Sequence, residues 1–249
     1  MTDLPGRDAQ RTTELLDDKR RLEQEVGDLE SFSNNIAHDL RAPLRAISGY
    51  AALLLEDHAS ALGVGGTDHV ARIEANARRM ASMIDGFLDF LRLGYAVPDA
   101  TEIDTAELVR SIARELQEQP GSTRAAIHID SLPPVRGDAT MLRRAWSNLL
   151  SNAIKFSARH PEPEILISAE RRGDEVVFSI RDNGVGFDMT YADQLFGVFN
   201  RLHAADEFPG VGVGLAIVRR IVVRHGGRIW ARGEPGNGAT FCFTLPLPQ

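Results

Sequence analysis

The chain of 249 residues has little of several features that define other classes of protein. Its single cysteine, Cys242, excludes a disulfide within the chain and favours a reducing compartment. The longest uninterrupted apolar run is short, about residues 50–55, whereas a membrane-spanning helix needs roughly 18 apolar residues. The N-terminal segment MTDLPGRDAQR is polar and lacks the apolar core of a signal peptide. These absences predict a cytoplasmic protein without a membrane span.

The charge balance also narrows the possibilities. The net charge is −7, which argues against a broad electrostatic surface for nucleic acid. Hydrophobic residues make up 43% and charged residues 25%, the profile of a globular protein of one large or two ordinary domains. No internal repeat or low-complexity tract interrupts it.

The N-terminal part, from about Asp8 to Arg92, predicts long helices with one internal proline, Pro43. Apolar residues recur at heptad spacing beside the charged run DDKRRLEQE, which is typical of a coiled coil that runs into a bundle helix. This first apolar stripe comprises Leu15, Leu22, Val26, Leu29, Ile36, Leu40, Leu44, Ile47, Ala51 and Leu54.

The segment ASALGVGG breaks this pattern and predicts a short loop. A second stripe follows it, at Val70, Ile73, Ala77, Met80, Ile84, Phe87 and Leu91. Two such helices make an antiparallel hairpin. Because one hairpin cannot bury both stripes well, the simplest solution is a homodimer in which two chains pair into a four-helix bundle.

After the linker GYAVPDA the pattern changes to a mixture of strands and helices. Helices are predicted at 107–119, at 139–157 with Asp138 as the N-cap, and at 213–227; strands are predicted at 125–130 and in two hairpins, 164–184 and 227–247. The predicted fold is therefore a helical hairpin followed by an α/β sandwich, with helices on one face of a largely antiparallel sheet.

The stretch SNNIAHDLRAPL places a histidine on a helix surface. His38 lies about 200° around the helix from the apolar stripe at Ile36, so it should face solvent. A lone exposed histidine usually has no function. However, Asp39 beside it could orient the ring, and Pro43 loosens the helix just beyond it. An exposed imidazole is largely unprotonated near neutral pH and can then accept a phosphoryl group.

Three segments of the C-terminal part could hold the phosphate donor. Asn148, Asn152 and Lys155 share one helix face, where amide oxygens suit Mg²⁺ and the lysine suits phosphate, although a plain polar face would look the same. Asp182 opens the turn DNGVGFD and could accept a hydrogen bond from an adenine amino group. GVGVG at 210–214 runs into a helix, as phosphate-binding loops do.

The order of these motifs says more than any one of them. The histidine helix is followed by Asn-x3-Asn-x2-Lys, then Asp-x-Gly-x-Gly, then Gly-x-Gly-x-Gly. Asn152 and Asp182 are 30 residues apart, and so are Asp182 and Gly212.

From about Leu29 to Pro248 the chain resembles the transmitter module of sensor histidine kinases in two-component signalling. HDLRAPL resembles the phosphoacceptor box, NLLSNAIKFS the N-box, DNGVGFD and GVGVGLAIV the two glycine boxes, and LFGVFNRLH the phenylalanine box. Within the family it is most similar to transmitters attached to phytochrome or PAS sensors.

The resemblance implies three regions: a coiled-coil input helix at 1–30, a dimerisation and histidine phosphotransfer domain at 31–95, and a Bergerat-type ATP-binding domain at 101–249. It implies ATP and Mg²⁺ as cofactors, an upstream sensor domain or sensor protein, and the receiver domain of a response regulator as partner. His38 would be phosphorylated with help from Asp39, and Asn152 would hold Mg²⁺. The nucleotide-binding residues would be Asn148, Asn152, Lys155, Phe156, Asp182, Gly184, Gly186, Phe196, Phe199, Arg201, Gly212, Gly214 and Thr240, beside a mobile lid running through about Pro209.

The resemblance also implies what the chain does less well. Many such kinases have threonine or asparagine four residues after the histidine, where it positions water for dephosphorylation of the regulator. Here that residue is Ala42, so weak phosphatase activity is expected. Two other functions stay open: a non-catalytic phosphotransfer or docking dimer with a degenerate ATP-binding domain, and a nucleotide hydrolase. Asn148 disfavours the hydrolase, because an amide is a poor general base for activating water.

Overall fold

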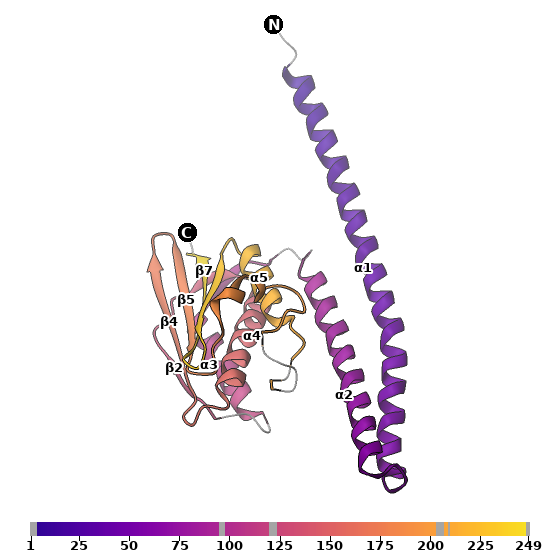
Figure 1. Cartoon of the computed structure of the whole chain (residues 1–249). Coiled ribbons are helices and arrows are strands. Elements are labelled where there is room, and N and C mark those ends of the chain that lie inside the picture. Colours follow the sequence, from indigo (N-terminus) through magenta and orange to yellow (C-terminus); the bar gives the residue numbers. More distant parts are fainter. Residues whose placement is uncertain (1–3, 95–97, 120–123, 203–206, 209, 248–249) are drawn as a thin grey trace. The chain divides into compact units, whose positions relative to one another are not determined.

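The computed structural model describes residues 4–94, 98–119, 124–202, 207–208 and 210–247. Between residues 4 and 32 it describes side chains only at Arg21 and Gln24, so the predicted coiled-coil residues before Ile36 lie outside the described side chains. The chain divides into two units, Met1–Tyr95 and Ala96–Gln249, each of which is described by itself (Figure 1). The predicted linker falls partly on residues 95–97, which are not described.

The first unit consists of helix α1, Leu4–Asp57, and helix α2, Ala59–Arg92. Pro43 lies inside α1 without ending it. The connection between the helices is shorter than the predicted loop, because α2 already begins at Ala59. Its first helical turn is formed by a hydrogen bond from the amide of Leu62 to the carbonyl of His58. Gly63 then interrupts the helix with φ 63° and ψ 179°, a conformation that glycine adopts without strain.

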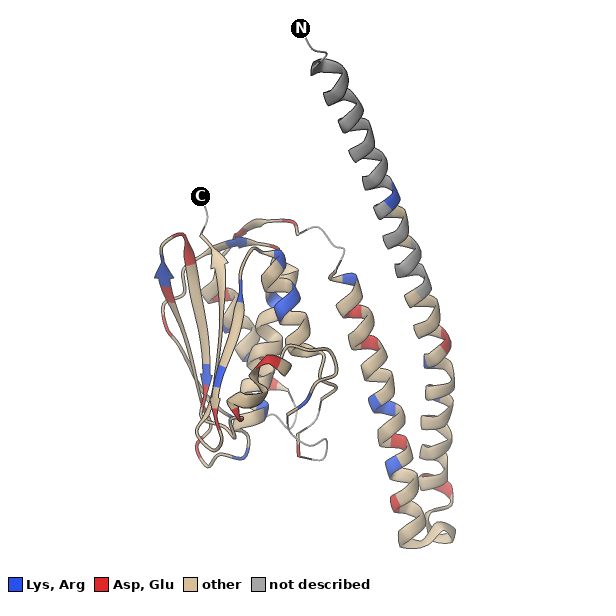
Figure 2. Ribbon diagram, turned by 45° about the horizontal axis from the view of Figure 1, so that its top comes forward, with Lys and Arg blue, Asp and Glu red and all other residues tan. Residues whose placement is uncertain are grey.

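Two polar contacts set the antiparallel register of this hairpin. Arg41 donates from Nε to Asp85 Oδ1 at 2.9 Å, and Arg92 donates from Nη2 to Asn34 Oδ1 at 2.8 Å. Within α2, acidic and basic residues are interspersed along the helix (Figure 2), and some form ion pairs, such as Arg72–Asp68 and Arg78–Glu74. These pairs on the outer surface contribute little stability, since exposed ion pairs are screened by water.

The apolar stripes of the hairpin are only partly buried. One set of residues packs between α1 and α2 and is less than 9% exposed: Ala37, Leu44, Ala51, Val70, Ala77 and Leu88. A second set on the same helices is 40% exposed or more: Ile36, Leu40, Ile47, Leu53, Leu54, Ile73, Met80 and Phe87. An apolar surface of this extent is unusual on an isolated chain. No helix in the described part of the chain is apolar over a length sufficient to cross a membrane.

The second unit is an α/β sandwich. Its main sheet has the strand order β2-β4-β5-β7-β6, in which only the β2–β4 pair is parallel. The strands are β2 Ala126–Ile129, β4 Glu164–Arg172, β5 Glu175–Asp182, β6 Ile229–Glu234 and β7 Gly238–Pro246. Helices α3 Thr105–Glu118, α4 Ala139–Ser157 and α5 Gly214–Arg224 cover one face of this sheet (Figure 1).

Two features of the sandwich have no clear signal in the sequence. A small second sheet pairs β1, Thr101–Ile103, with β3, Val135–Gly137. A 3-10 helix, η1, spans Met189–Gln194. The predicted helices and hairpins are otherwise confirmed within a few residues, and Asp138 caps α4 as predicted by accepting from the amide of Met141 at 2.9 Å.

The core forms where α4 packs on the alternating apolar residues of β5 and β7. Trp146 is fully buried, with ring centroids 5.5 Å from Phe178 and 5.1 Å from Phe243 in edge-to-face geometry. His225, at the end of α5, connects α5 to the start of α4: its Nδ1 donates to Ile221 and its Nε2 accepts from the amide of Asp138 at 3.0 Å. The histidine is therefore neutral, with its proton on Nδ1.

Replacing Trp146 separates packing from hydrogen bonding in this core. The indole Nε1 is buried without a partner among the described residues. Trp146→Ala should lower the free energy of unfolding by about 3–5 kcal/mol, because it leaves a cavity. Trp146→Phe should cost much less, since it keeps an aromatic ring and removes the unpaired N–H. Urea denaturation followed by Trp230 fluorescence measures both; equal losses would contradict this account of the core.

Candidate functional site

His38, the predicted phosphoacceptor, lies on the surface of α1. The side chains of His38 and Asp39 are 76% and 82% exposed, and Nδ1 of the ring lies 3.3 Å from Asp39 Oδ1. When the ring proton is on Nδ1 it faces this carboxylate, and the lone pair is on Nε2. The prediction that His38 is exposed is thus confirmed, and the ring has a nitrogen available to an electrophile.

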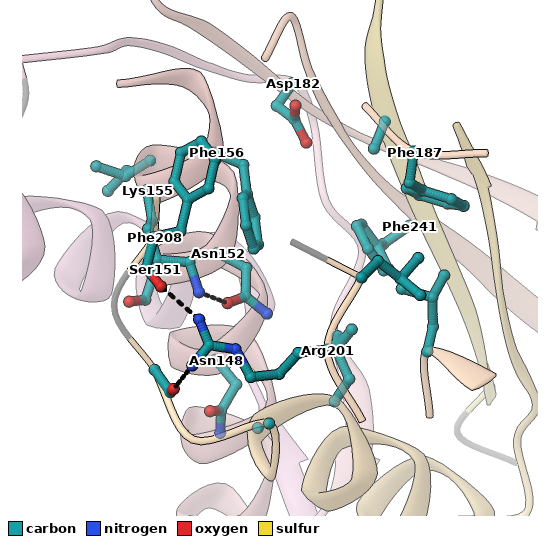
Figure 3. A pocket seen from close by; sticks show the side chains of 18 of the residues that line it. Asn148, Ser151, Asn152, Lys155, Phe156, Asp182, Phe187, Arg201, Phe208 and Phe241 are labelled. Carbon is teal, nitrogen blue, oxygen red and sulfur yellow. Dashed lines mark hydrogen bonds between the residues drawn. The ribbon is translucent and has the colours of Figure 1, made fainter. Parts of the chain in front are cut away.

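The second unit contains an open cavity of about 770 Å³, within the usual range of small-molecule sites. It is bordered by the C-terminal half of α4, the end of β5, the segment around residues 195–202, the N-terminus of α5 and the start of β7. Figure 3 shows side chains of these elements converging on it. The described parts of the chain therefore leave this space unfilled.

The polar face of α4 forms one wall, as predicted. Lys155 donates from Nζ to Asn152 Oδ1 at 3.1 Å (Figure 3). Asn148 donates from Nδ2 to the carbonyl of Arg144, which leaves its Oδ1 against the start of α5. A β-carbon at Gly214 would lie 2.7 Å from that oxygen, so glycine is needed for this close approach. All three side chains line the cavity.

The N-terminus of α5 forms the opposite wall. The helix begins at Gly214 with no side-chain cap hydrogen bond at Val213, and Gly212, Gly214 and Leu215 line the cavity. Arg201 holds the segment that precedes the helix by donating to the carbonyls of Gly210 and Phe208 at 2.6 and 2.7 Å. An uncapped helix N-terminus is electropositive, and it can bind an anionic group such as phosphate.

Asp182, at the end of β5, is 3% exposed and accepts at Oδ1 from the amide of Gly184 at 2.9 Å. Burial raises its pKa to about 6, although hydrogen bonds from the amides of Gly184 and Ala239 act in the opposite direction. A buried carboxylate that lines an otherwise largely apolar end of the cavity is suited to accept a hydrogen bond from a ligand N–H.

The pKa of Lys155 is lowered in the site. Burial, and secondarily the positive charge of Arg201, lowers its pKa to about 8. The ammonium lies 4.1 Å from the ring centroid of Phe156, which in turn packs on Phe208 at 5.0 Å. An anionic ligand would reverse this effect by supplying the negative charge that the protein does not provide here.

Of the predicted nucleotide-binding residues, nine line the cavity: Asn148, Asn152, Lys155, Phe156, Asp182, Gly186, Arg201, Gly212 and Gly214. Four do not: Gly184, Phe196, Phe199 and Thr240. Gly184 instead permits packing on α4, since a β-carbon there would lie 2.3 Å from the Phe156 carbonyl oxygen. The predicted lid falls partly on residues 203–206 and 209, outside the described residues.

Thr240 is separated from the cavity by the alternation of β7. Successive side chains of a strand point to opposite faces of the sheet. Ala239 and Phe241 line the cavity, so Thr240 between them lies on the other face, paired in register with Arg181 and Arg232. The amide of Ala239 bonds Asp182, so the backbone of this strand does reach the site.

Several lining residues were missed from the sequence. Most are apolar or aromatic and come from separate elements: Phe187, Leu195, Phe208, Leu215 and Phe241. Phe187 packs near Phe241 with ring centroids 6.2 Å apart, and together they form the apolar end near Asp182 (Figure 3). The only sequence signal for them is the alternation of β7 and the proximity of Phe187 to the glycine-rich turn.

The fold and this cavity define an ATPase-like nucleotide-binding sandwich. Residues 137–249 match the family described as "Histidine kinase-, DNA gyrase B-, and HSP90-like ATPase", and residues 28–96 match the "His Kinase A (phospho-acceptor) domain". The chain therefore belongs to the histidine kinases and carries both domains of a transmitter module.

Relatives and solved structures agree with this assignment. The phytochrome-like protein Cph1 of Synechocystis sp. is 34% identical over 234 residues, which cover 94% of this chain and 31% of Cph1. The methanogenesis regulatory histidine kinase FilI of Methanothrix harundinacea is 35% identical over 243 residues, 94% of this chain and 27% of FilI. The crystal structure of full-length ShkA in complex with AMPPNP superposes with a TM-score of 0.62 at 27% identity, covering 86% of this chain and 45% of ShkA. The chain thus spans about a third or less of these curated relatives.

The raised pKa of Asp182 predicts a pH dependence of stability. Since the folded carboxyl holds its proton more tightly than the unfolded one, its stabilising contribution is complete below about pH 4 and is lost as the pH rises through about 6. Asp182→Asn removes this titration. Between about pH 4 and pH 6, the free energy of unfolding of the wild type should therefore fall relative to that of the variant. Urea denaturation followed by tryptophan fluorescence measures both. Parallel pH curves would show that Asp182 has an ordinary pKa.

Proposed function

We propose that this chain autophosphorylates His38 with ATP and passes the phosphoryl group to an aspartate of a response regulator receiver domain. The observation that carries the proposal is the presence in one chain of an exposed imidazole with a free Nε2 and an open, phosphate-suited cavity. Among the residues that the structure describes, no side chain fills the cavity or covers the His38 ring.

The transfer requires little covalent help from the protein. The Nε2 lone pair attacks the γ-phosphorus, a P–N bond forms, and the P–O bond to the β-phosphate breaks as ADP leaves. The Nδ1 proton stays on the ring beside Asp39, whose carboxylate stabilises the positive charge that develops there. Positioning of donor and acceptor should dominate the rate.

The cavity orients the nucleotide by its two ends. Asp182 accepts from the adenine amino group at the apolar end, between the glycine turn and β7. The uncapped amides of α5 and the ammonium of Lys155 bind the phosphates at the other end. Binding of the polyphosphate would raise the pKa of Lys155 back towards its ordinary range, because it supplies the missing countercharge.

The donor set also fits Mg²⁺. Among the described residues no group of three or more His, Cys, Asp or Glu side chains could hold a metal. Asn152 offers an amide oxygen now accepting from Lys155, and Mg²⁺ commonly takes one or two protein oxygens with substrate phosphates and water. When bound, the ion neutralises phosphate charge as the transfer proceeds.

A homodimer explains the half-buried apolar stripes. The exposed set from Ile36 to Phe87 lies on the same two helices as the buried set, and a second hairpin would cover it and complete a four-helix bundle. A monomer at micromolar concentration in analytical ultracentrifugation would contradict this arrangement.

The labelling experiment tests the proposed function directly. Incubation with γ-labelled ATP and Mg²⁺ should give acid-labile, base-stable label on the protein. His38→Gln should abolish the label because it removes the acceptor nitrogen, whereas His69→Gln, at an exposed histidine of α2, should retain it. Asn152→Ala should reduce label to background, because it removes the metal ligand.

Other outcomes separate the alternatives. Free phosphate without labelled protein would indicate a nucleotide hydrolase. Absence of both, with phosphate accepted from a labelled partner, would indicate a non-catalytic phosphotransfer module.

The phosphatase expectation has its own test. Ala42 lies one turn after His38 on the exposed surface of α1 and has no side-chain hydrogen-bonding group to orient water. The wild type should therefore barely accelerate hydrolysis of a phosphorylated receiver domain, and Ala42→Thr should accelerate it. The expectation of weak phosphatase activity would be contradicted if the wild type rapidly hydrolysed the phosphorylated receiver domain and lost this activity when its ATP site was blocked.

A further inference from the structure

One wall of the cavity is held by side chains rather than by secondary structure. Glu207, Phe208 and Gly210, here called the outer wall, line the cavity, and none of the three belongs to a helix or strand. A β-carbon at Gly210 would lie 3.5 Å from Lys155 Nζ, so this wall adjoins the polar face of α4. Because no ladder of backbone hydrogen bonds fixes these residues, their position depends on the groups that bind them.

Arg159 joins the outer wall to α4. It follows Ala158, the C-cap of α4, and its Nη2 donates to the carbonyl of Glu207 at 3.0 Å. Its guanidinium carbon also lies 4.7 Å from the ring centroid of Phe208, which is a cation–π contact. Within the described part of the chain, the hydrogen bond and the ring contact of Arg159 are therefore both made with the outer wall.

Phe208 connects Arg159 to the interior of the site. The residue is 5% exposed, and its ring centroid lies 5.0 Å from that of Phe156 (Figure 3). The ammonium of Lys155 lies over the same Phe156 ring, 4.1 Å from its centroid. Contacts thus run from Arg159 through Phe208 and Phe156 to Lys155, at the end of the cavity assigned to phosphate.

We propose that Arg159 is a positioning residue for the nucleotide. By holding the outer wall on α4, it keeps Phe208 packed on Phe156 and slows the release of a bound nucleotide. Its kinetic consequence rests on the proposed function: the KM for ATP depends on Arg159, whereas the rate constant of His38 labelling at saturating ATP does not. The reason is that the wall stabilises the bound nucleotide equally before and during phosphoryl transfer.

Binding of a fluorescent AMPPNP analogue to the full chain, with Mg²⁺ present, measures the effect directly. Arg159→Ala should weaken binding about tenfold, mainly through faster dissociation, because it removes a charge-assisted hydrogen bond and a cation–π contact. Arg159→Lys should recover part of the affinity, since an ammonium can still lie over the ring and donate to a carbonyl. Arg232→Ala is the matched control. This exposed arginine of β6 pairs in register with Thr240, on the sheet face away from the cavity, so binding should be unchanged.

A double-mutant cycle with Phe208→Leu separates positioning from direct contact with the nucleotide. In the Phe208→Leu background, Arg159→Ala should weaken binding by no more than about twofold further, because the ring that Arg159 holds is absent. Losses that multiply independently would show that Arg159 binds the nucleotide itself, and would overturn the positioning role. Unchanged affinity of the single variant Arg159→Ala would overturn it too. So would a large drop in its unfolding temperature, since replacing an exposed side chain should leave stability nearly unchanged.

Labelling of His38 with γ-labelled ATP gives a second test that leaves Phe208 in place. Arg159→Ala should raise the KM for ATP about tenfold and keep the rate constant at saturating ATP within about twofold of the wild type. A lower saturating rate with an unchanged KM would overturn the positioning role. If the wild type binds nucleotide but labels no histidine, the proposed function fails, while the comparison of binding among the Arg159 variants still decides this inference.

Discussion

The site depends on helix α4, one side of which packs in the core while the other side lines the cavity. On its buried side α4 packs Trp146, Leu149 and Leu150 against the sheet, and on its other side it presents Asn148, Asn152 and Lys155 to the cavity. Because both sets are fixed by the same helical geometry, the packing of Trp146 between Phe178 and Phe243 determines where the polar face points. The position of the amide oxygens and the ammonium is therefore a consequence of core packing rather than of the loops around them.

The glycines of the site act mainly by allowing elements to approach α4 and each other. A β-carbon at Gly184 would meet the Phe156 carbonyl, and one at Gly186, whose φ is 62°, would lie 1.9 Å from the Glu234 carbonyl oxygen. These contacts hold the turn after β5 against both α4 and the β6–β7 hairpin, so that Asp182 is buried and its pKa is raised. Electrostatic tuning of the site thus follows from close backbone packing.

Periodicity in the sequence was sufficient to predict the helices of the hairpin, the hairpins of the sheet and the face shared by Asn148, Asn152 and Lys155. It failed where geometry depends on a single residue or on distant elements. The resemblance named Thr240 as a binding residue, whereas the residues of β7 that line the cavity are its neighbours Ala239 and Phe241. The apolar lining, such as Phe187 and Phe208, comes from separate segments whose proximity no local pattern encodes. The short β1–β3 sheet is likewise too brief to show a period.

The two polar contacts of the helical hairpin restrict how α1 can move. Arg41–Asp85 and Arg92–Asn34 join the helices at two levels in the same antiparallel register. Sliding α1 lengthwise by one turn, about 5.4 Å, would break both contacts at once and misalign the apolar residues between them. Bending or tilting of α1 can preserve both contacts. A tilt of α1 can therefore reach the level of His38 with both contacts intact, whereas a piston-like displacement of α1 would have to break them.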